Sequence, residues 1–434
     1  MKAALAGWLM LLAGTASAAP APDFAGRWEV AVREYGQKNF YLPMTDGRLV
    51  VAADDGSASF GHLSFAGTLE KDGLHLACNN AGRSCGALVL NVSKAGLTGS
   101  GTLTRGDGTL PVPVTVTGRR PAPRPAAATA HVYDPKEFHP FYSPSLPPVL
   151  HIFPGDSVST RTADSRGQDK DGLPKAPRGN PQTGPFYVEG AMPGDTLVVH
   201  LTRVRTNRDT AYQTNQVASN ALETGYIQTL PKDSGFATWK IDAASGTASL
   251  AEPGERLKNY VIKLQPMLGC IGVAPPGEET LGSGHLGVFG GNMDFREMRE
   301  GVTLYLPVFQ PGALLYLGDG HAEQGDGELP GQGLETSLDV QFSVDVIENK
   351  SLGQPWVEDN EYVMVLGIGN STDEAMRRAT TGISLWLADH YRLTPQDIAA
   401  VLGTAMQYQI AEVVDSEIDV VAKLRKDALA RIAK

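Results

Sequence analysis

The sequence predicts a mainly β protein, sandwich- or barrel-like, with a helical C-terminal portion and a separate small all-β domain at the N-terminus. Three observations support this prediction. Short apolar runs alternate with turn residues over most of the chain, a Pro/Ala-rich tract interrupts them at 119–131, and helical spacing of apolar residues is confined to the tail. The composition agrees, because 49 glycines and 29 prolines among 434 residues favour many turns between short strands.

The first 18 residues have the pattern of a secretory signal peptide. Lys2 precedes the apolar stretch Ala3–Leu12, and Ala16-Ser17-Ala18 provides a small-residue cleavage site. The apolar stretch is much shorter than the roughly 20 residues that a spanning helix needs, which disfavours the alternative of a membrane anchor. We therefore expect residues 1–18 to be removed, and the protein to be periplasmic or secreted without a membrane span.

Residues 23–118 predict a small antiparallel β-domain. Turn pairs such as Asp46-Gly47 and Asp72-Gly73 separate its apolar runs. The eight runs are Arg27–Val32, Arg48–Ala52, Ala58–Phe60, Gly67–Leu69, Leu74–Ala77, Leu88–Val92, Gly99–Leu103 and Val112–Val116. Cys78 and Cys85 flank one turn, and an exported chain can form disulfides, so we expect a bridge between them. Cys270 is then either a buried apolar residue or a reactive thiol.

A linker and a second domain complete the organisation. The tract 119–131 is too rich in Pro and Ala to build a core and predicts an extended linker before a domain at 132–434. Strands are expected at Val149–Phe153, Ser157–Thr162, Thr196–Val204, Tyr260–Leu264, Val302–Pro307 and Leu338–Val346. Helices are expected at Ser371–Leu387, from Thr394-Pro395 onward, and at Val421–Ala433.

The charge balance narrows the choice of partners. Lys+Arg 37 against Asp+Glu 48 gives a formal net charge of −11. Such a balance argues against nucleic acid and against an anionic membrane surface as partners. Cations, neutral small molecules and other proteins remain as candidate partners.

The stretch Gly318–Glu328 concentrates groups that bind metals. Its eleven residues contain His321 and four carboxylates among four glycines. Imidazole and carboxylate are ligands for Zn²⁺ and similar divalent ions, and glycines let a backbone turn so that such side chains converge. The sequence has no HExxH or CxxC pair, so a site here must be assembled from separate loops. The alternative is a solvated acidic loop.

Several long motifs carry a resemblance to a known family. They are Pro154–Asp164 (PGDSVSTRTAD), Asn180–Leu201, Gly269–Pro276 (GCIGVAPP), Gly290–Asp294 (GGNMD) and Leu306–Glu328, which includes PGALLYLGDGHAEQGDGE. In this order, and with the helical tail, they resemble the acetamidase/formamidase family. The resemblance extends from about Tyr133 to Ile418 and leaves out the N-terminal β-domain, so the chain looks like an exported member with an extra domain.

The resemblance implies hydrolysis of the carbon–nitrogen bond of a small linear amide, with release of ammonia and a carboxylate. It also implies a β-rich, often homo-oligomeric fold, with a divalent metal in some members. Among the matching acidic and imidazole positions, we rank Asp294, His321 and Glu328 as metal ligands, with zinc favoured and calcium possible. Asp164, Asp326 and Glu328 are the candidate catalytic acid–base residues. Gly290, Gly291 and Asn292 are candidates for substrate binding and oxyanion stabilisation.

Other interpretations stay open at this point. A non-catalytic periplasmic binding protein could keep the amidase scaffold, and an esterase or lactam hydrolase could use the same groups. Cys270 could be a nucleophile, although it lies in an apolar run with no basic neighbour. Phe289 stands where many members of the family carry His. Among the remaining polar residues, we expect His285 on a loop over the pocket and Glu189 in the interior, while His151 and His200 belong to the core or line the pocket.

Overall fold

The computed structural model describes residues 23–34, 46–61, 63–80, 83–104, 111–232 and 235–433. The expected signal peptide at 1–18 lies outside these residues. The chain divides into two compact units, Met1–Pro121 and Ala122–Lys434, and each is described by itself. No helix in the described ranges is long and apolar enough to cross a membrane.

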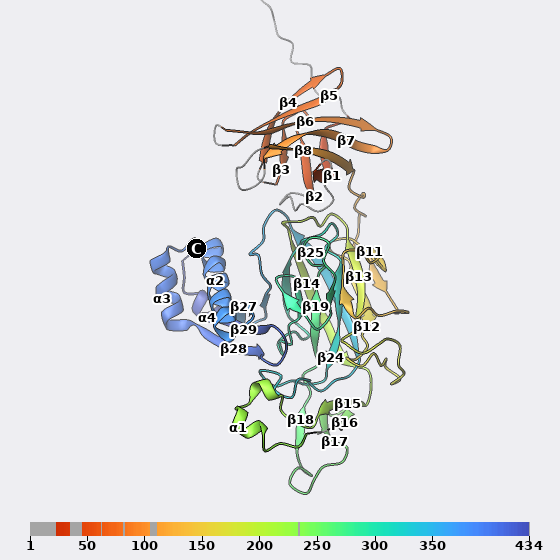
Figure 1. Cartoon of the computed structure of the whole chain (residues 1–434), viewed down its shortest axis with the longest axis vertical. Helices are drawn as coiled ribbons and strands as arrows, with labels where there is room; N and C mark the ends of the chain where they lie inside the picture. Colours follow the sequence, from red (N-terminus) through yellow and green to blue (C-terminus); the bar gives the residue numbers. More distant parts are fainter. Residues whose placement is uncertain are drawn as a thin grey trace, which may run out of the picture. The chain divides into compact units, whose positions relative to one another are not determined.

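The first unit is a closed antiparallel barrel of eight strands (Figure 1). Each strand pairs with the next, and β8 pairs with β1 to close the ring. The strands are β1 Gly26–Glu34, β2 Asp46–Val51, β3 Ala58–Phe60, β4 Leu63–Glu70, β5 Gly73–Asn80, β6 Arg83–Ser93, β7 Gly96–Thr104 and β8 Pro111–Arg119. Alternate side chains, such as those of Trp28, Leu74 and Leu90, fill the interior. The prediction of a separate all-β domain is confirmed.

The barrel contains the expected disulfide. Cys78 on β5 and Cys85 on β6 are bridged across the hairpin that these strands form. Both residues belong to the apolar core of the barrel. Cys270, in the second unit, is a free buried thiol.

The second unit is built on two large sheets. The six-stranded sheet has the order β11-β13-β24-β19-β22-β21 and the nine-stranded sheet the order β28-β29-β27-β26-β23-β14-β25-β12-β9. In the first sheet, the strands are β11 Leu150–Ile152, β13 Gln182–Val188, β19 Met267–Gly272, β21 Leu286–Gly287, β22 Gly290–Asn292 and β24 Leu315–His321. In the second they are β9 Ala130–Val132, β12 Ser157–Arg161, β14 Thr196–Thr206, β23 Thr303–Pro307, β25 Leu338–Ile347, β26 Trp356–Glu358, β27 Tyr362–Gly369, β28 Gln407–Glu412 and β29 Ile418–Arg425.

One apolar core joins the two sheets. Phe186 of β13 meets Phe342 of β25 edge to face, with ring centroids 5.3 Å apart, and both side chains are fully buried. A four-stranded sheet lies beside α1 at one end of this unit (Figure 1). Its strands are β15 Thr210–Thr214, β16 Phe236–Asp242, β17 Thr247–Leu250 and β18 Val261–Lys263, and the helical turns are η1 Ser219–Ala221 and α1 Thr224–Ile227. A further pair, β10 Phe141–Tyr142 and β20 Leu281–Gly282, is separate.

Two of the three tail helices form as expected. Ser371 caps α2 (Thr372–Tyr391) by accepting a hydrogen bond from the Glu374 backbone N–H. Thr394 and Asp397 form a capping box at the start of α3 (Pro395–Ala405). The helix α2 packs beside β27 and β29 (Figure 1).

The prediction of a third tail helix at Val421–Ala433 is wrong over its first half. Residues up to Arg425 belong to β29, and only Lys426–Leu429 form a helix, α4. The strand is paired on both edges, with β27 and β28, and the β-branched pair Val420-Val421 is buried there. Burial on both faces removes the alternation that marks a strand, so a helix and a strand look alike in this sequence. The linker is also shorter than expected, because strand β8 ends and strand β9 begins within residues 119–131.

Candidate functional site

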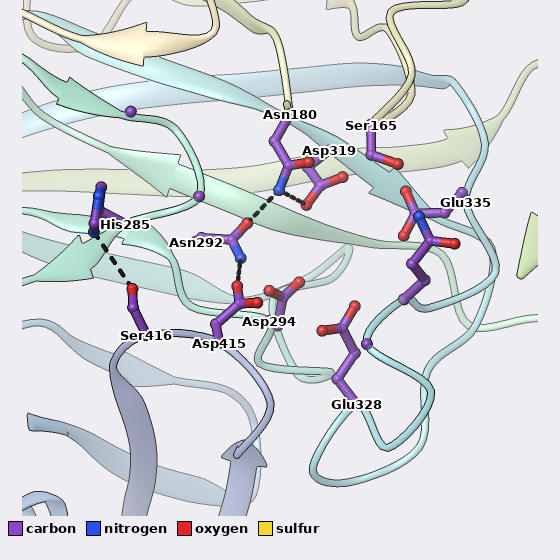
Figure 2. Close-up of a pocket in the computed structure, with 14 residues that line it drawn as sticks. Ser165, Asn180, His285, Asn292, Asp294, Asp319, Glu328, Glu335, Asp415 and Ser416 are labelled. Atoms are coloured by element: carbon purple, nitrogen blue, oxygen red, sulfur yellow. Dashed lines mark hydrogen bonds between the residues drawn. The ribbon is translucent and has the colours of Figure 1, made fainter. Parts of the chain in front are cut away.

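A polar cavity opens where the central strands of the six-stranded sheet end. Its volume is about 390 Å³. His321 is the last residue of β24, Asp319 lies two residues before it, and Asp294 follows β22 by two residues. Figure 2 shows that Asp294, Asp319, Glu328 and Glu335 converge on this cavity from different segments. The lining residues are Ser165, Asn180, Gly282, Gly284, His285, Asn292, Asp294, Asp319, Glu328, Gly331, Gln332, Glu335, Asp415 and Ser416.

His321 is fully buried, and its tautomer is fixed by Gln324. The Gln324 side-chain N–H₂ donates to the backbone carbonyl of Asp294, so its Oε1 faces His321. The Nδ1 of His321 donates to that oxygen at 2.8 Å. The Nε2 lies 3.1 Å from Glu335 Oε1 and 3.6 Å from Asp319 Oδ1, yet it has no hydrogen bond within the described residues. In its neutral form this imidazole therefore presents the lone pair of Nε2 to the carboxylates, as a metal-ligating histidine does.

Four carboxylates surround this imidazole, and each is at most 5% exposed. Asp294 Oδ1, Asp319 Oδ1 and Glu335 Oε2 have no hydrogen-bond partner in the described chain. Among the described residues that line the cavity, none is Lys or Arg. Buried carboxylates without cationic partners are unfavourable unless they bind protons or a metal ion. The orphaned oxygens and the free Nε2 thus fit a divalent cation.

Two sets of three residues share His321 in this arrangement. One ligand atom from each of Asp294, His321 and Glu328 lies within 4.8 Å of the others, and the same holds for Asp319, His321 and Glu335. The second set faces the free Nε2, whereas Asp294 Oδ1 lies 3.8 Å from Nδ1, which Gln324 already engages. The geometry therefore favours Asp319 and Glu335 as the partners of the imidazole.

Burial and neighbouring charges raise the pKa of four groups in the cluster, Asp294, Asp319, Glu328 and His321. Burial, strengthened by Glu335, raises the pKa of Asp319 to about 6. Burial also raises the pKa of Asp294 and of Glu328 well above their usual values. For His321, burial alone lowers the pKa, but Glu335 and Asp319 outweigh it and raise the pKa well above its ordinary value. Without a bound cation, Asp294, Asp319, Glu328 and His321 thus retain protons to higher pH than exposed groups of the same type, and metal binding would displace the proton of His321 Nε2.

A second layer of side chains holds the carboxylates in place. Asn180 Nδ2 donates to Asp319 Oδ2 at 3.0 Å and to Asn292 Oδ1 at 2.8 Å, and Asn292 Nδ2 donates to Asp415 Oδ2 at 2.6 Å (Figure 2). The Cys270 thiol also donates to Asn292 Oδ1 at 2.8 Å. Burial raises the pKa of Cys270 well above its usual value, so the buried thiol is a poor nucleophile.

The backbone at the cavity is strained. Asn180, Asp294, Asp319 and Glu328 have positive φ angles of 51°, 40°, 54° and 46°, and all four line the cavity. Non-glycine residues in this conformation cost roughly 1–3 kcal/mol each, and such strain is typical of functional sites. Gly269 leaves room for the cluster, because an added Cβ would lie 2.5 Å from Asp294 Oδ1.

The structure brings some of the predicted site residues into the cavity and leaves others outside it. Asp294, His321 and Glu328, expected as metal ligands, lie together in the cluster. Asn292 lines the cavity, but its side-chain amide is already engaged. Gly290 and Gly291 do not line it: they form β22 and pair with β19. They are glycines because an added Cβ would clash with the carbonyl oxygens of neighbouring strands.

The two other predicted acid–base residues do not join the cluster. Asp164 is fully buried away from the cavity wall, where it pairs with Arg208 at 2.8 Å and accepts two backbone N–H bonds. Its role is structural. The side chain of Asp326 is about half exposed, and it accepts a hydrogen bond from Gln409. Its proximity to His321 in the sequence is misleading, because the loop turns it away from the cavity.

Some functional residues escaped sequence reasoning, and some expectations were wrong. Glu335 follows His321 by 14 residues (335 − 321) and Asp415 by 94 (415 − 321), neither at a characteristic spacing, although a β-bridge pairs Glu335 with His321. His285 lines the cavity at an exposed position, as expected. His151 and His200 are not core residues, because their side chains are 53% and 38% exposed. Phe289 is buried in the apolar core, and Glu189 forms a hydrogen bond with His151.

The fold and the site define a class, namely a β-sandwich domain with a buried histidine–carboxylate centre in a polar cavity. Comparison with known proteins names the family. The chain belongs to the acetamidase/formamidase family, whose model matches residues 128–281 and 288–416. The barrel strands, residues 26–119, lie outside this match.

Individual relatives agree with this assignment. The chain is 22% identical over 242 residues to a formamidase of Methylophilus methylotrophus, covering 44% of this chain and 60% of the relative. A putative formamidase of Schizosaccharomyces pombe is 38% identical over 61 residues, 14% of this chain and 15% of the relative. The chain thus spans less than two thirds of the length of these curated relatives.

Solved structures match over a longer stretch. A predicted acetamidase/formamidase from Thermoanaerobacter tengcongensis has 28% identity and a TM-score of 0.60, covering 70% of this chain and 99% of that one. An acetamidase from Yersinia enterocolitica has 28% identity and a TM-score of 0.61, covering 71% and 94%.

Proposed function

We propose that this chain hydrolyses the carbon–nitrogen bond of a small linear amide, with release of ammonia and a carboxylate. The observation that carries the proposal is the buried cluster of His321 and four carboxylates, which lies in a cavity within the part of the chain that matches the family. Such a cluster can activate water and handle protons, which are the two requirements of amide hydrolysis.

A divalent metal ion fits this cluster, and we propose zinc or calcium. His321 Nε2, Asp319 and Glu335 would hold it, with Asp294 and Glu328 beside them. Their orphaned atoms support this assignment. When bound, such an ion would polarise the amide carbonyl and lower the pKa of water. The tautomer of His321 that Gln324 fixes is the one required for coordination through Nε2.

The chain's own residues would handle the protons. Glu328 lines the cavity, and burial raises its pKa well above the ordinary value, which makes its carboxylate a stronger base than an exposed glutamate. We propose that its carboxylate accepts a proton from the attacking water and then delivers it to the departing amide nitrogen. The new C–O bond forms as the C–N bond breaks, and ammonia leaves. Asn180 would keep the Asp319 carboxylate oriented meanwhile.

The test is ammonia release by the purified chain from acetamide and formamide, with and without a chelator. We expect release that the chelator abolishes and that zinc or calcium restores, with one ion per chain by elemental analysis. Full activity after chelation would remove the metal from the proposal. Binding of amides without turnover would favour a non-catalytic binding protein. Turnover of esters or lactams but not of linear amides would favour an esterase or lactam hydrolase.

We further propose that the protein is exported and forms homo-oligomers. The disulfide Cys78–Cys85 supports export, since such bonds persist in oxidising compartments. Fractionation of cells that express the full chain should find the mature protein outside the cytoplasm, starting near Ala19. Light scattering on the mature protein measures its oligomeric state, and a monomer would contradict the proposed homo-oligomer.

A further inference from the structure

A second, larger cavity adjoins the first, and the mechanism above does not use it. Its volume is about 660 Å³. The loop that follows β24 contributes to both cavities, and two of its residues, Glu328 and Gln332, line both. The candidate proton carrier therefore stands at the boundary between the two spaces.

The first cavity alone exceeds the needs of the simplest amides. Liquid water occupies about 30 Å³ per molecule, and formamide or acetamide has only a few non-hydrogen atoms. A space of about 390 Å³ therefore holds several such molecules. Cavities of a few hundred cubic ångströms and more are typical of sites for larger organic ligands.

The wall of the second cavity is suited to an apolar group. Trp239 and Tyr260 meet edge to face with ring centroids 6.3 Å apart, and Ile262, Leu329 and Leu334 also line the space. Tyr260 is 52% exposed and Leu329 is 45% exposed, so apolar surface is available for contact. Burial of apolar surface against such a wall favours binding of an aryl or alkyl group.

Two of the three carboxylates of this wall are engaged by the protein itself: Glu323 pairs with Arg296 at 3.1 Å, and Asp326 accepts a hydrogen bond from Gln409 at 2.7 Å. A cationic substituent would have to compete with these contacts. Lys263, the cation of this wall, is exposed to solvent, where water screens its attraction for an anionic substituent. At the boundary, the buried Oε1 of Gln332 has no hydrogen-bond partner among the described residues, so it can accept an N–H of an amide.

We propose that the preferred substrate is an amide with an uncharged apolar substituent, aryl or alkyl, which occupies the second cavity while its amide group lies beside the His321 cluster. Gln332 Oε1 would accept an N–H of this amide. The inference rests on the proposed function and names its substrate class. It predicts that acetamide and formamide are poor substrates in comparison with larger amides.

The experiment compares acetamide with phenylacetamide, whose ring is on the acyl side, and acetanilide, whose ring is on the nitrogen; ammonia release is followed for the first two and aniline release for acetanilide. We expect kcat/KM for one aryl amide to exceed that for acetamide by about tenfold or more, as burial of an aromatic ring would give. Tyr260→Ala should lower this ratio at least about threefold. Tyr226→Ala is the matched control, because Tyr226 is a comparably exposed tyrosine (58%) that lines a separate cavity, and it should leave the ratio unchanged.

A binding measurement separates failure of this inference from failure of the proposed function. Calorimetry with phenylacetamide and acetamide is done on the wild type and both tyrosine variants. Equal or better hydrolysis of acetamide would overturn the inference and leave the amidase proposal standing. Tyr260-dependent binding of phenylacetamide without hydrolysis of any amide would overturn the function and retain the second cavity as a binding site. Neither binding nor hydrolysis would overturn both.

Discussion

The barrel and the sandwich bury very different groups. The interior of the barrel is filled with apolar side chains, and its buried carboxylate Glu29 has a cationic partner, Arg119, at 2.9 Å. The sandwich has a larger apolar core, but one end of its central sheet buries four carboxylates with a single imidazole. The barrel core and the paired Glu29 carboxylate can be understood as stabilising a fold, although one oxygen of Glu29 lacks a hydrogen bond, whereas the polar cluster of the sandwich cannot be explained in this way.

This difference separates structural from functional burial. Unpartnered buried carboxylates and positive φ angles at Asp294, Asp319 and Glu328 reduce stability, and the rest of the domain must compensate. Natural sites commonly retain such features because the chemistry requires them. If this is correct, substitutions in the two regions should separate activity from stability.

The largest effect is expected from His321→Ala. Loss of the imidazole should lower kcat/KM for the amide substrate at least about a hundredfold, because it removes the residue shared by both ligand sets. The matched barrel variant is Leu90→Ala, which removes a fully buried apolar side chain and should cost about 2–5 kcal/mol of barrel stability. Its kcat/KM should match the wild type at temperatures where the protein is folded. Activity of His321→Ala within tenfold of the wild type would contradict the assignment of the site.

A pH-dependent effect on stability is next in size. Burial and the charge of Asp415 raise the pKa of Glu412 to about 8 from an ordinary value of 4.5. The folded chain therefore binds this proton more tightly than the unfolded chain does. The resulting stability is fully present below about pH 4.5 and is lost as the pH rises towards 8, by roughly a few kcal/mol.

Glu412→Gln tests this directly, because its amide stays neutral. Denaturation of the chelator-treated protein between pH 5 and 9 should show a flatter profile for the variant, with higher stability at the alkaline end. The described barrel carboxylates with shifted pKa values, Asp55 and Asp72, shift downward, and the raised pKa of His75, caused by its hydrogen bond to Asp72, belongs to a partly exposed side chain whose effect water screens, so the barrel should lose little stability over this range. Parallel profiles for variant and wild type would argue against a neutral Glu412.

The barrel disulfide has a smaller effect. Replacement of Cys78 and Cys85 together by Ser should cost about 2 kcal/mol of barrel stability, since the loop that the bond closes is short. Amide hydrolysis should not change, as both residues belong to the barrel core. Urea denaturation, with ammonia release as the parallel assay, measures the two properties. A loss of activity in the folded double variant would show that the barrel is coupled to the site.

Local patterns predicted the fold well, and the site less completely. Alternating runs located the eight strands of the barrel and six strands of the second unit, but not β13, β19 and β24 of the sheet that carries the cavity. The caps at Ser371 and Thr394 located two helices. The strand at Ile418–Arg425 was missed because burial on both faces hides its period. The predicted metal ligands Asp294, His321 and Glu328 came from the family motifs, and the structure places them together.

Contacts between distant segments were out of reach of the sequence. Glu335 reaches His321 through an isolated β-bridge, and Asp415 reaches Asn292 across more than a hundred residues. Neither contact has a spacing that local reasoning could use. Proximity in sequence also gave a false signal at Asp326, because a glycine-containing loop reverses direction within a few residues.

The smallest effect is expected at Asp326. The side chain is about half exposed and hydrogen-bonded to Gln409, and screening by water limits its influence on the buried cluster. Asp326→Asn should therefore change kcat/KM for acetamide less than about twofold and stability by less than about 0.5 kcal/mol. Its pH–rate profile should overlay that of the wild type. A shifted profile would mean that this carboxylate exchanges protons with the substrate after all, and that the loop after β24 rearranges to bring it into the cavity. The assignment of the site treats the buried carboxylates of the cluster as functional and exposed ones as not functional. It would then be wrong for Asp326.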